Sequence, residues 1–156
     1  MGELQRQPIE LGRAEVFDWG RDGMILACGA LLPNCLKAAA RLREEGLDVG
    51  VINTRFIKPL DTEVVLKAIE TSPFVLTVEE SALATGFGSA VLEAAADAGL
   101  NASHVTRLGI PDRFIEHGER GELLADLGLD AAGIARTCLG LAESAGLIRE
   151  PARRVS

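Results

Sequence analysis

The sequence has few cysteines and lacks any long apolar run. Its three cysteines, Cys28, Cys35 and Cys138, lie far apart and form no Cys-x-x-Cys pair, so the sequence predicts neither a disulfide framework nor a zinc site. No apolar run approaches the roughly 18 residues that a membrane-spanning helix needs. The polar segment Met1–Glu15 lacks the apolar centre of a signal peptide. We therefore expect reduced thiols, a cytoplasmic location and no membrane partner.

Basic residues are also scarce. The chain has 16 lysines and arginines against 23 aspartates and glutamates, which gives a net charge of −7. A nucleic-acid surface needs clustered positive charge, and the closing Arg149, Arg153 and Arg154 are too few to supply it. The sequence therefore predicts no nucleic-acid partner.

The 156 residues suit one soluble domain with a full apolar core. We expect a single domain over residues 1–156, with a core at about 8–146 and a flexible tail at 147–156. Apolar runs predict strands at residues 14–19, 24–28, 49–52, 74–78 and 105–108. Helical spacing and capping residues predict helices at residues 33–46, 62–71, 86–98, 122–127 and 130–145.

This alternation predicts an α/β fold with three layers, in which a mainly parallel sheet carries helices on both faces. The first two strands read as an antiparallel hairpin across the turn Gly20–Gly23, so strand 14–19 should be an antiparallel edge. Ligands and partners of such sheets meet the loops at the carboxyl ends of the strands. Those loops are expected at residues 29–33, 53–61, 79–86 and 109–118.

Charged and glycine residues concentrate in these loops. Arg55 has the geometry to hold an anion, and the alternative that we favour is an ion pair with an acid such as Glu79. The pair Glu79 and Glu80 has the chemistry for acid–base catalysis, but neighbouring strand residues face opposite ways, so a salt bridge or a loop-capping role is favoured. The glycines of Gly86–Ser89 suit either anion binding or close packing, and we favour packing.

The last loop holds the densest group of charges in the sequence. His117 follows Glu116, which permits general acid–base chemistry, although no nucleophile stands near it in the sequence. His104, at a strand start, carries less signal. A hydrogen-bonded structural or interface role for His117 is the favoured interpretation.

Several loop motifs resemble one family. The segments 55–61 (RFIKPLD), 78–80 (VEE) and 86–91 (GFGSAV) resemble the C-terminal domain of transketolase-like thiamine-diphosphate enzymes. The segment 107–118 (RLGIPDRFIEHG) closely resembles the 1-deoxy-D-xylulose-5-phosphate synthases, and the resemblance spans about residues 8–142. Within the wider family, the loop 109–118 distinguishes this chain from the matching domain of a 2-oxo acid dehydrogenase beta subunit, which is the nearest alternative.

The resemblance implies a role within a larger enzyme. The complete synthases condense pyruvate with glyceraldehyde 3-phosphate, release carbon dioxide, and supply isoprenoid (terpenoid), thiamine and pyridoxal synthesis. Their thiamine diphosphate and magnesium belong to N-terminal and middle domains, so this chain alone is expected to be inactive and to bind neither. Gly20–Gly23 with Asn53 superficially resembles the family's magnesium motif, but a hairpin turn fits this segment better. We therefore assign no catalytic, cofactor-binding or metal-binding residue.

The resemblance also implies partners. The domain should pack on the N-terminal and middle domains of its enzyme and help to hold a homodimer, with Phe114 and Ile115 as apolar anchors. The candidate interface or loop-anchoring residues are Arg55, Glu79, Glu80, Phe87, Arg107, Asp112, Arg113, Phe114, Glu116 and His117. Two further alternatives are a stand-alone module that binds an anion or a protein partner, and a structural subunit encoded separately from its catalytic domains.

Overall fold

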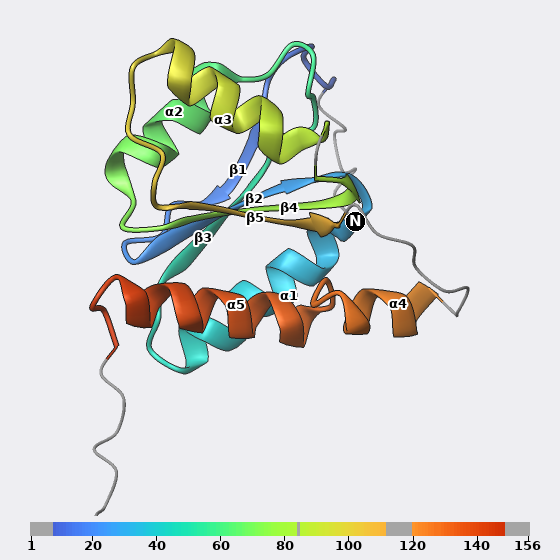
Figure 1. The fold of residues 1–156 in the computed structure, drawn as a ribbon, viewed down its shortest axis with the longest axis vertical. Helices are drawn as coiled ribbons and strands as arrows, with labels where there is room; N and C mark the ends of the chain where they lie inside the picture. The colour runs from blue at the N-terminus through green and yellow to red at the C-terminus, as the bar shows by residue number, and fades with distance from the viewer. Residues whose placement is uncertain (1–7, 84, 112–119, 149–156) are drawn as a thin grey trace, which may run out of the picture.

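A five-stranded sheet forms the centre of the protein in the computed structural model, which describes residues 8–83, 85–111 and 120–148. Its strands are β1 (Glu15–Asp18), β2 (Gly23–Cys28), β3 (Val49–Asn53), β4 (Val75–Ala82) and β5 (Val105–Ile110), and their order across the sheet is β1-β3-β2-β4-β5 (Figure 1). Strands β3, β2, β4 and β5 run parallel, and β1 runs antiparallel to β3. The predicted mainly parallel sheet with an antiparallel edge strand is confirmed.

The predicted hairpin of the first two strands is wrong, because β1 pairs with β3 and the connection to β2 passes over the start of β3. At this crossing the Asp22 N–H donates to the carbonyl oxygen of Asp48 (2.8 Å), and the Asp48 N–H donates to the Asp22 carboxylate (2.7 Å). A Cβ on Gly20 would overlap the backbone nitrogen of Gly50. The glycines thus permit a close crossing, and two reciprocal hydrogen bonds fix it.

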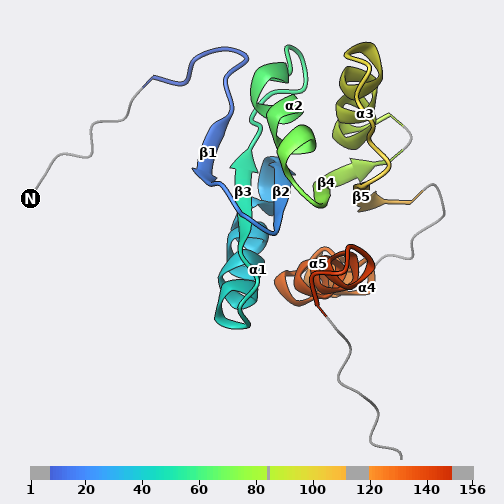
Figure 2. The same cartoon turned by 90° about the vertical axis from the view of Figure 1, so that its left-hand side faces the viewer.

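Helices cover both faces of the sheet, as predicted (Figure 2). A short 3₁₀ turn (Gly29–Leu31), α1 (Leu32–Glu44), α4 (Arg120–Asp126) and α5 (Ala131–Ser144) lie on one face. On the other face lie α2 (Thr62–Thr71) and α3 (Phe87–Asp97). Alternate residues of β2 enter the two cores: Ile25 and Ala27 pack toward α1 and α5, while Met24 and Leu26 pack toward α2 and α3. The strand is buried because both of its faces are covered.

The helix starts follow the predicted capping residues. The Asp61 carboxylate accepts a hydrogen bond from the Val64 N–H at the start of α2 (3.4 Å) and a second from the Ala14 N–H ahead of β1 (2.8 Å). Asp130 caps α5 by accepting from the Gly133 N–H (2.8 Å). Gly46, just after α1, has a φ of +86°, a conformation that glycine adopts without strain. None of the helices within the described ranges is long and apolar enough to cross a membrane.

Candidate functional site

The candidate site lies at the carboxyl ends of the parallel strands, where the predicted loops leave the sheet. Asn53 ends β3, Glu79 lies in the second half of β4, and Ile110 ends β5. The last loop is described only as far as Pro111. Five predicted interface residues therefore lie outside the described residues: Asp112, Arg113, Phe114, Glu116 and His117.

Glu79 is the buried acid of this site, with 2% of its surface exposed. It follows Thr77 at a two-residue spacing, so both side chains leave β4 on the side of α3. One carboxylate oxygen accepts a hydrogen bond from the Gly88 N–H in the first turn of α3 (3.1 Å). Burial raises the pKa of Glu79, and the Gly88 N–H and the positive charge of Arg107 offset only part of that increase. Glu79 therefore acts as a cap on the start of α3.

Arg107 fastens the loop between β4 and α3 from the neighbouring strand. Its Nη1 donates to the carbonyl oxygen of Leu83 (2.9 Å) and to the hydroxyl of Ser89 (3.1 Å). A Cβ on Gly88 would lie 2.8 Å from the Thr77 hydroxyl and 2.9 Å from the Arg107 side chain. These contacts favour the close-packing interpretation of the glycines in this loop.

Phe87 and Glu80 flank this loop and differ in burial. Phe87, the first residue of α3, is fully buried and packs in the core with Val91 and Ala95. Its burial favours the loop-anchoring role over direct contact with a partner. Glu80 is exposed, unlike its neighbour Glu79. The two adjacent acids are therefore in different environments, as expected from their alternation along a strand.

Arg55 ties a second loop to the edge strand. It has a φ of +58°, and its guanidinium forms an ion pair with Glu15 of β1. The favoured interpretation, an ion pair with an acid, is confirmed, but the predicted partner Glu79 is wrong. Strand β1 lies beside β3, and Glu15 is opposite Asn53 in the register. Glu15 is therefore the nearer acid to the loop that begins after Asn53.

The remaining reactive groups have structural partners; two lie at this end of the sheet, and His104 lies at the opposite end, just before β5. The Thr54 hydroxyl donates to the carbonyl oxygen of Ala27 (2.8 Å), and burial raises the pKa of the Cys28 thiol beside it. His104 Nε2 lies 2.7 Å from the carbonyl oxygen of Ile69. A thiol with a raised pKa is a poor nucleophile at neutral pH. The described residues thus form no nucleophile–base pair here.

The structure also tests the magnesium-like motif. Asp22 is hydrogen-bonded to Asp48 just before β3, whereas Asn53 ends that strand, so the two lie at opposite ends of the sheet. Across the described ranges, no three His, Cys, Asp or Glu side chains are grouped to hold a metal ion. The residues of this motif do not fit a diphosphate-bound magnesium ion.

Sequence reasoning missed Glu15, Thr77 and Ser89. The pairing of β1 with β3 would have placed Glu15 beside Arg55. The two-residue spacing to Glu79 was the available signal for Thr77, since alternate strand residues share a face. Ser89 receives the Arg107 side chain from 18 residues away, and the sequence around it carries no signal for that contact.

The comparisons with known proteins agree on one family. The family described as "Transketolase, C-terminal domain" matches residues 12–134. A 1-deoxy-D-xylulose-5-phosphate synthase from Geobacter sulfurreducens is 50% identical over 133 residues, which are 85% of this chain and 21% of that protein. The synthase from Rhodopirellula baltica is 45% identical over 139 residues, which are 89% of this chain and 22% of that protein. The chain thus spans about a fifth of the curated relatives that it matches.

Solved structures give the same fold. A split-gene transketolase, described as an inactive beta4 tetramer, has a TM-score of 0.78 and 30% identity, covering 86% of this chain and 44% of that chain. A transketolase mutant from Pichia stipitis has a TM-score of 0.59 and 19% identity, covering 84% of this chain and 18% of that one. The second likeness concerns the fold alone.

Proposed function

This chain belongs to the family of transketolase C-terminal domains, and from that premise we propose that it is the C-terminal assembly domain of a 1-deoxy-D-xylulose-5-phosphate synthase. The observation that carries the proposal is the high identity to curated synthases over more than four fifths of the chain. The complete enzyme would condense pyruvate with glyceraldehyde 3-phosphate and release carbon dioxide. We place it in the cytoplasm, in keeping with its free thiols.

The contacts of the site support an assembly role. The charge of Arg55 is neutralised by Glu15, and one carboxylate oxygen of Glu79 caps the first turn of α3. Arg107 holds the loop that begins at Leu83. These contacts fix the shape of the loops. Thiamine diphosphate would supply the carbanion chemistry from a site on other domains of the enzyme, with its magnesium ion.

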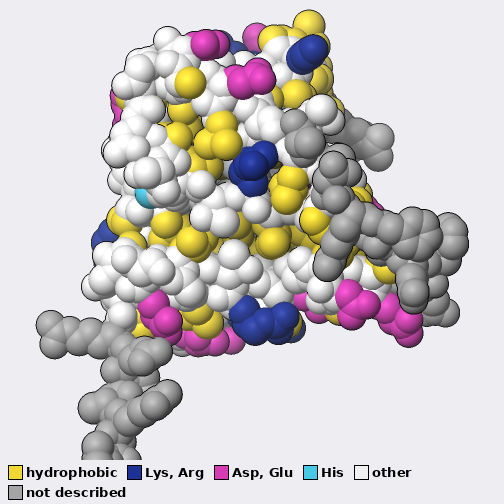
Figure 3. Space-filling model, in the orientation of Figure 1, with side chains coloured by type: hydrophobic (Ala, Val, Ile, Leu, Met, Phe, Trp, Pro, Cys, Tyr) yellow, Lys and Arg dark blue, Asp and Glu magenta, His cyan; other side chains and the backbone are white. Residues whose placement is uncertain are grey.

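We place the proposed contacts with other domains at the carboxyl ends of the parallel strands, next to β5. Figure 3 shows apolar side chains in a band across the molecule near β5, with acidic side chains gathered along the rim over α4 and α5. Leu108 and Ile110 of β5 are only partly buried. Asp112, Arg113 and Phe114 lie outside the described residues, and they remain candidates for contacts with the N-terminal and middle domains and the second subunit of a homodimer.

A domain exchange tests the proposal. This chain would replace the matching C-terminal fifth of the Geobacter sulfurreducens synthase, and the control would be that synthase cut before the exchanged domain. We expect the chimera to form a homodimer by sedimentation and to make 1-deoxy-D-xylulose 5-phosphate, whereas the shortened control should do neither. A chimera that is folded but no better than the shortened control would refute the assembly role.

The chain by itself should not bind the cofactor. Titration calorimetry of the isolated chain with thiamine diphosphate and magnesium is expected to show no binding, because the described residues group no three His, Cys, Asp or Glu side chains that could hold the magnesium ion. No decarboxylation of pyruvate is expected either. Micromolar binding of thiamine diphosphate would contradict the assignment of the cofactor to other domains.

A second arrangement is a separately encoded subunit that carries this domain. One observation favours it, since the split-gene transketolase to which this fold is similar has a beta chain that forms a tetramer of its own. A band near 16.5 kDa in an immunoblot of source cells would support this arrangement. A band about four times heavier would support the single-chain synthase.

A further inference from the structure

Exposed apolar side chains gather before, within and just after β1. The described residues include seven large exposed apolar side chains, of which five fall in residues 9–19: Ile9, Leu11, Val16, Phe17 and Trp19. Such clustering marks an interaction surface more often than scattered exposure does. Strand β1 forms one edge of the sheet, and β5 forms the opposite edge.

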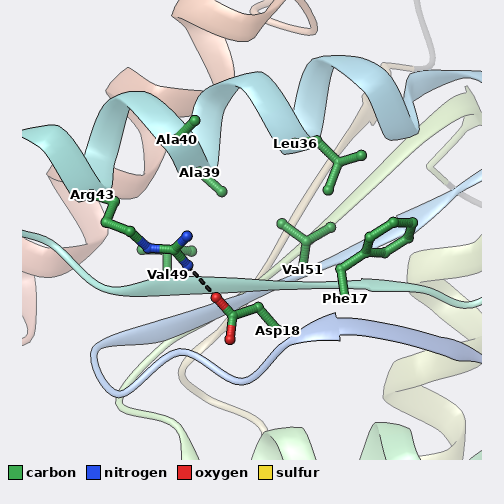
Figure 4. A pocket seen from close by; sticks show the side chains of 8 residues that line it. All are labelled: Phe17, Asp18, Leu36, Ala39, Ala40, Arg43, Val49 and Val51. Carbon is green, nitrogen blue, oxygen red and sulfur yellow. Dashed lines mark hydrogen bonds and ion pairs between the residues drawn. The ribbon is translucent and has the colours of Figure 1, made fainter.

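A groove beside β1 gives this surface its shape. Phe17 and Leu36 face each other across it, Ala39 and Ala40 line its α1 side, and Val49 and Val51 form its floor (Figure 4). Its volume is about 200 Å³. Because a cavity of roughly 150 Å³ holds a benzene ring, the groove has room for one large apolar side chain. We call this set of six residues the β1 groove.

Ion pairs frame the strand at both ends. Asp18 pairs with Arg43 at one end of the groove (Figure 4), and Glu15 pairs with Arg55 at the other end of β1. The strand is four residues long, and its register shifts between Val16 and Asp18. A short, irregular edge resists pairing with another strand. The arrangement suits side-chain packing, with an apolar centre and a polar rim.

We propose that the β1 groove receives an apolar side chain from the domain that precedes this one in a complete synthase. The partner's identity rests on the proposed function. The matched relatives are about five times as long as the matched segment, and the family is a C-terminal domain. A preceding domain therefore joins this one through the segment that contains Ile9 and Leu11, which places it next to β1. The exposed face of Phe17 is then covered in the whole enzyme.

Hydrogen exchange tests the inference. Amide exchange of peptides from β1 and α1 is compared between the isolated chain and the Geobacter sulfurreducens chimera described above. We expect both peptides to exchange more slowly in the chimera, while the peptide around Leu147, at the end of α5, stays unchanged. Protection limited to residues 85–89 and 105–111 would overturn the inference and leave the proposed function standing. Protection nowhere on this domain would overturn both.

Substitutions give a second readout. Phe17→Asp is compared with Leu147→Asp, since the two side chains have similar exposures of 46% and 40%. In the chimera, Phe17→Asp should remove the added protection of β1, and Leu147→Asp should not. Equal effects of the two variants would overturn the inference. So would protection of β1 that appears in the isolated chain as its concentration rises, because a second copy would then fill the groove.

Discussion

The substitution Phe87→Ala tests whether this side chain anchors its loop from the core. Phe87 is fully buried at the start of α3, next to Glu79 and the loop that Arg107 fastens. Truncation removes the whole phenyl ring from a site that no solvent reaches. The surrounding core can collapse only in part, because Val91 is held on the same helix.

The expected loss of unfolding free energy is about 3–5 kcal/mol, the range for Phe→Ala in protein cores. At about 2–4 °C per kcal/mol for a domain of this size, the melting temperature should fall by roughly 6–20 °C. The matched variant Phe17→Ala removes the same atoms from a side chain that is 46% exposed. Since about half of its burial is missing, that loss should be roughly 1 kcal/mol.

Urea denaturation of both variants, followed by far-ultraviolet circular dichroism, measures the difference. The two variants should show equal dependence of the free energy on urea concentration, so that their midpoints can be compared directly. Equal losses for Phe87→Ala and Phe17→Ala, or a loss below about 1.5 kcal/mol for Phe87→Ala, would refute the burial argument. Phe87 would then have to be considered for direct contact with a partner.

Three further predictions follow from buried polar groups. Burial raises the pKa of Glu79, so its ionisation should lower stability as the pH rises from the ordinary value near 4.5 through the raised pKa. In urea denaturation the stability of Glu79→Gln relative to the native chain should rise over that window, and a constant difference would contradict this. Asp61→Ala should cost about 1–3 kcal/mol by thermal unfolding, because two backbone N–H groups lose their acceptor, and Asp61→Asn should cost less. Burial raises the pKa of Cys35 and Cys138 to about 12, whereas Cys28 is partly exposed, so a thiol reagent at pH 8 should label Cys28, slowly because its pKa is also raised, and not the other two before unfolding; labelling of all three native thiols would count against it.

The elements of the fold follow from local patterns in the sequence. Asp61 and Asp130 mark helix starts because their carboxylates accept backbone N–H groups three residues on. Pro33 lies in the first turn of α1, where its missing N–H costs nothing. These signals depend on neighbours in the chain, so they can be read without the tertiary structure.

The position of β1 could not be predicted in the same way. A turn between two apolar runs usually makes a hairpin, and residues 20–23 have the composition of such a turn. The competing arrangement depends on contacts with Asp48 and Gly50, and Asp48 lies 26 residues beyond Asp22 in the chain. Only the packing of the whole sheet decides between these two pairings.

Side-chain partners at the site also depend on that pairing. The sequence places Arg55 just after one strand and Arg107 within another, and the structure agrees. Their acceptors are on Glu15, Leu83 and Ser89, at separations of 40, 24 and 18 residues. Such contacts depend on register and loop path, which residue type alone does not determine.

The two arginines differ in a way that bears on assembly. Arg55 faces a carboxylate, so its charge is neutralised, and an incoming anion would have to displace Glu15. Within the described part of the chain, the hydrogen bonds of Arg107 go to neutral acceptors, which hold its guanidinium in place, and its positive charge also acts on the buried Glu79. A fixed charge near β5 can select a partner surface by electrostatic complementarity, while the apolar β1 groove can supply affinity at the opposite edge. The distribution of charge and apolar surface therefore favours contacts at both edges of the sheet, with specificity and affinity supplied by different residues.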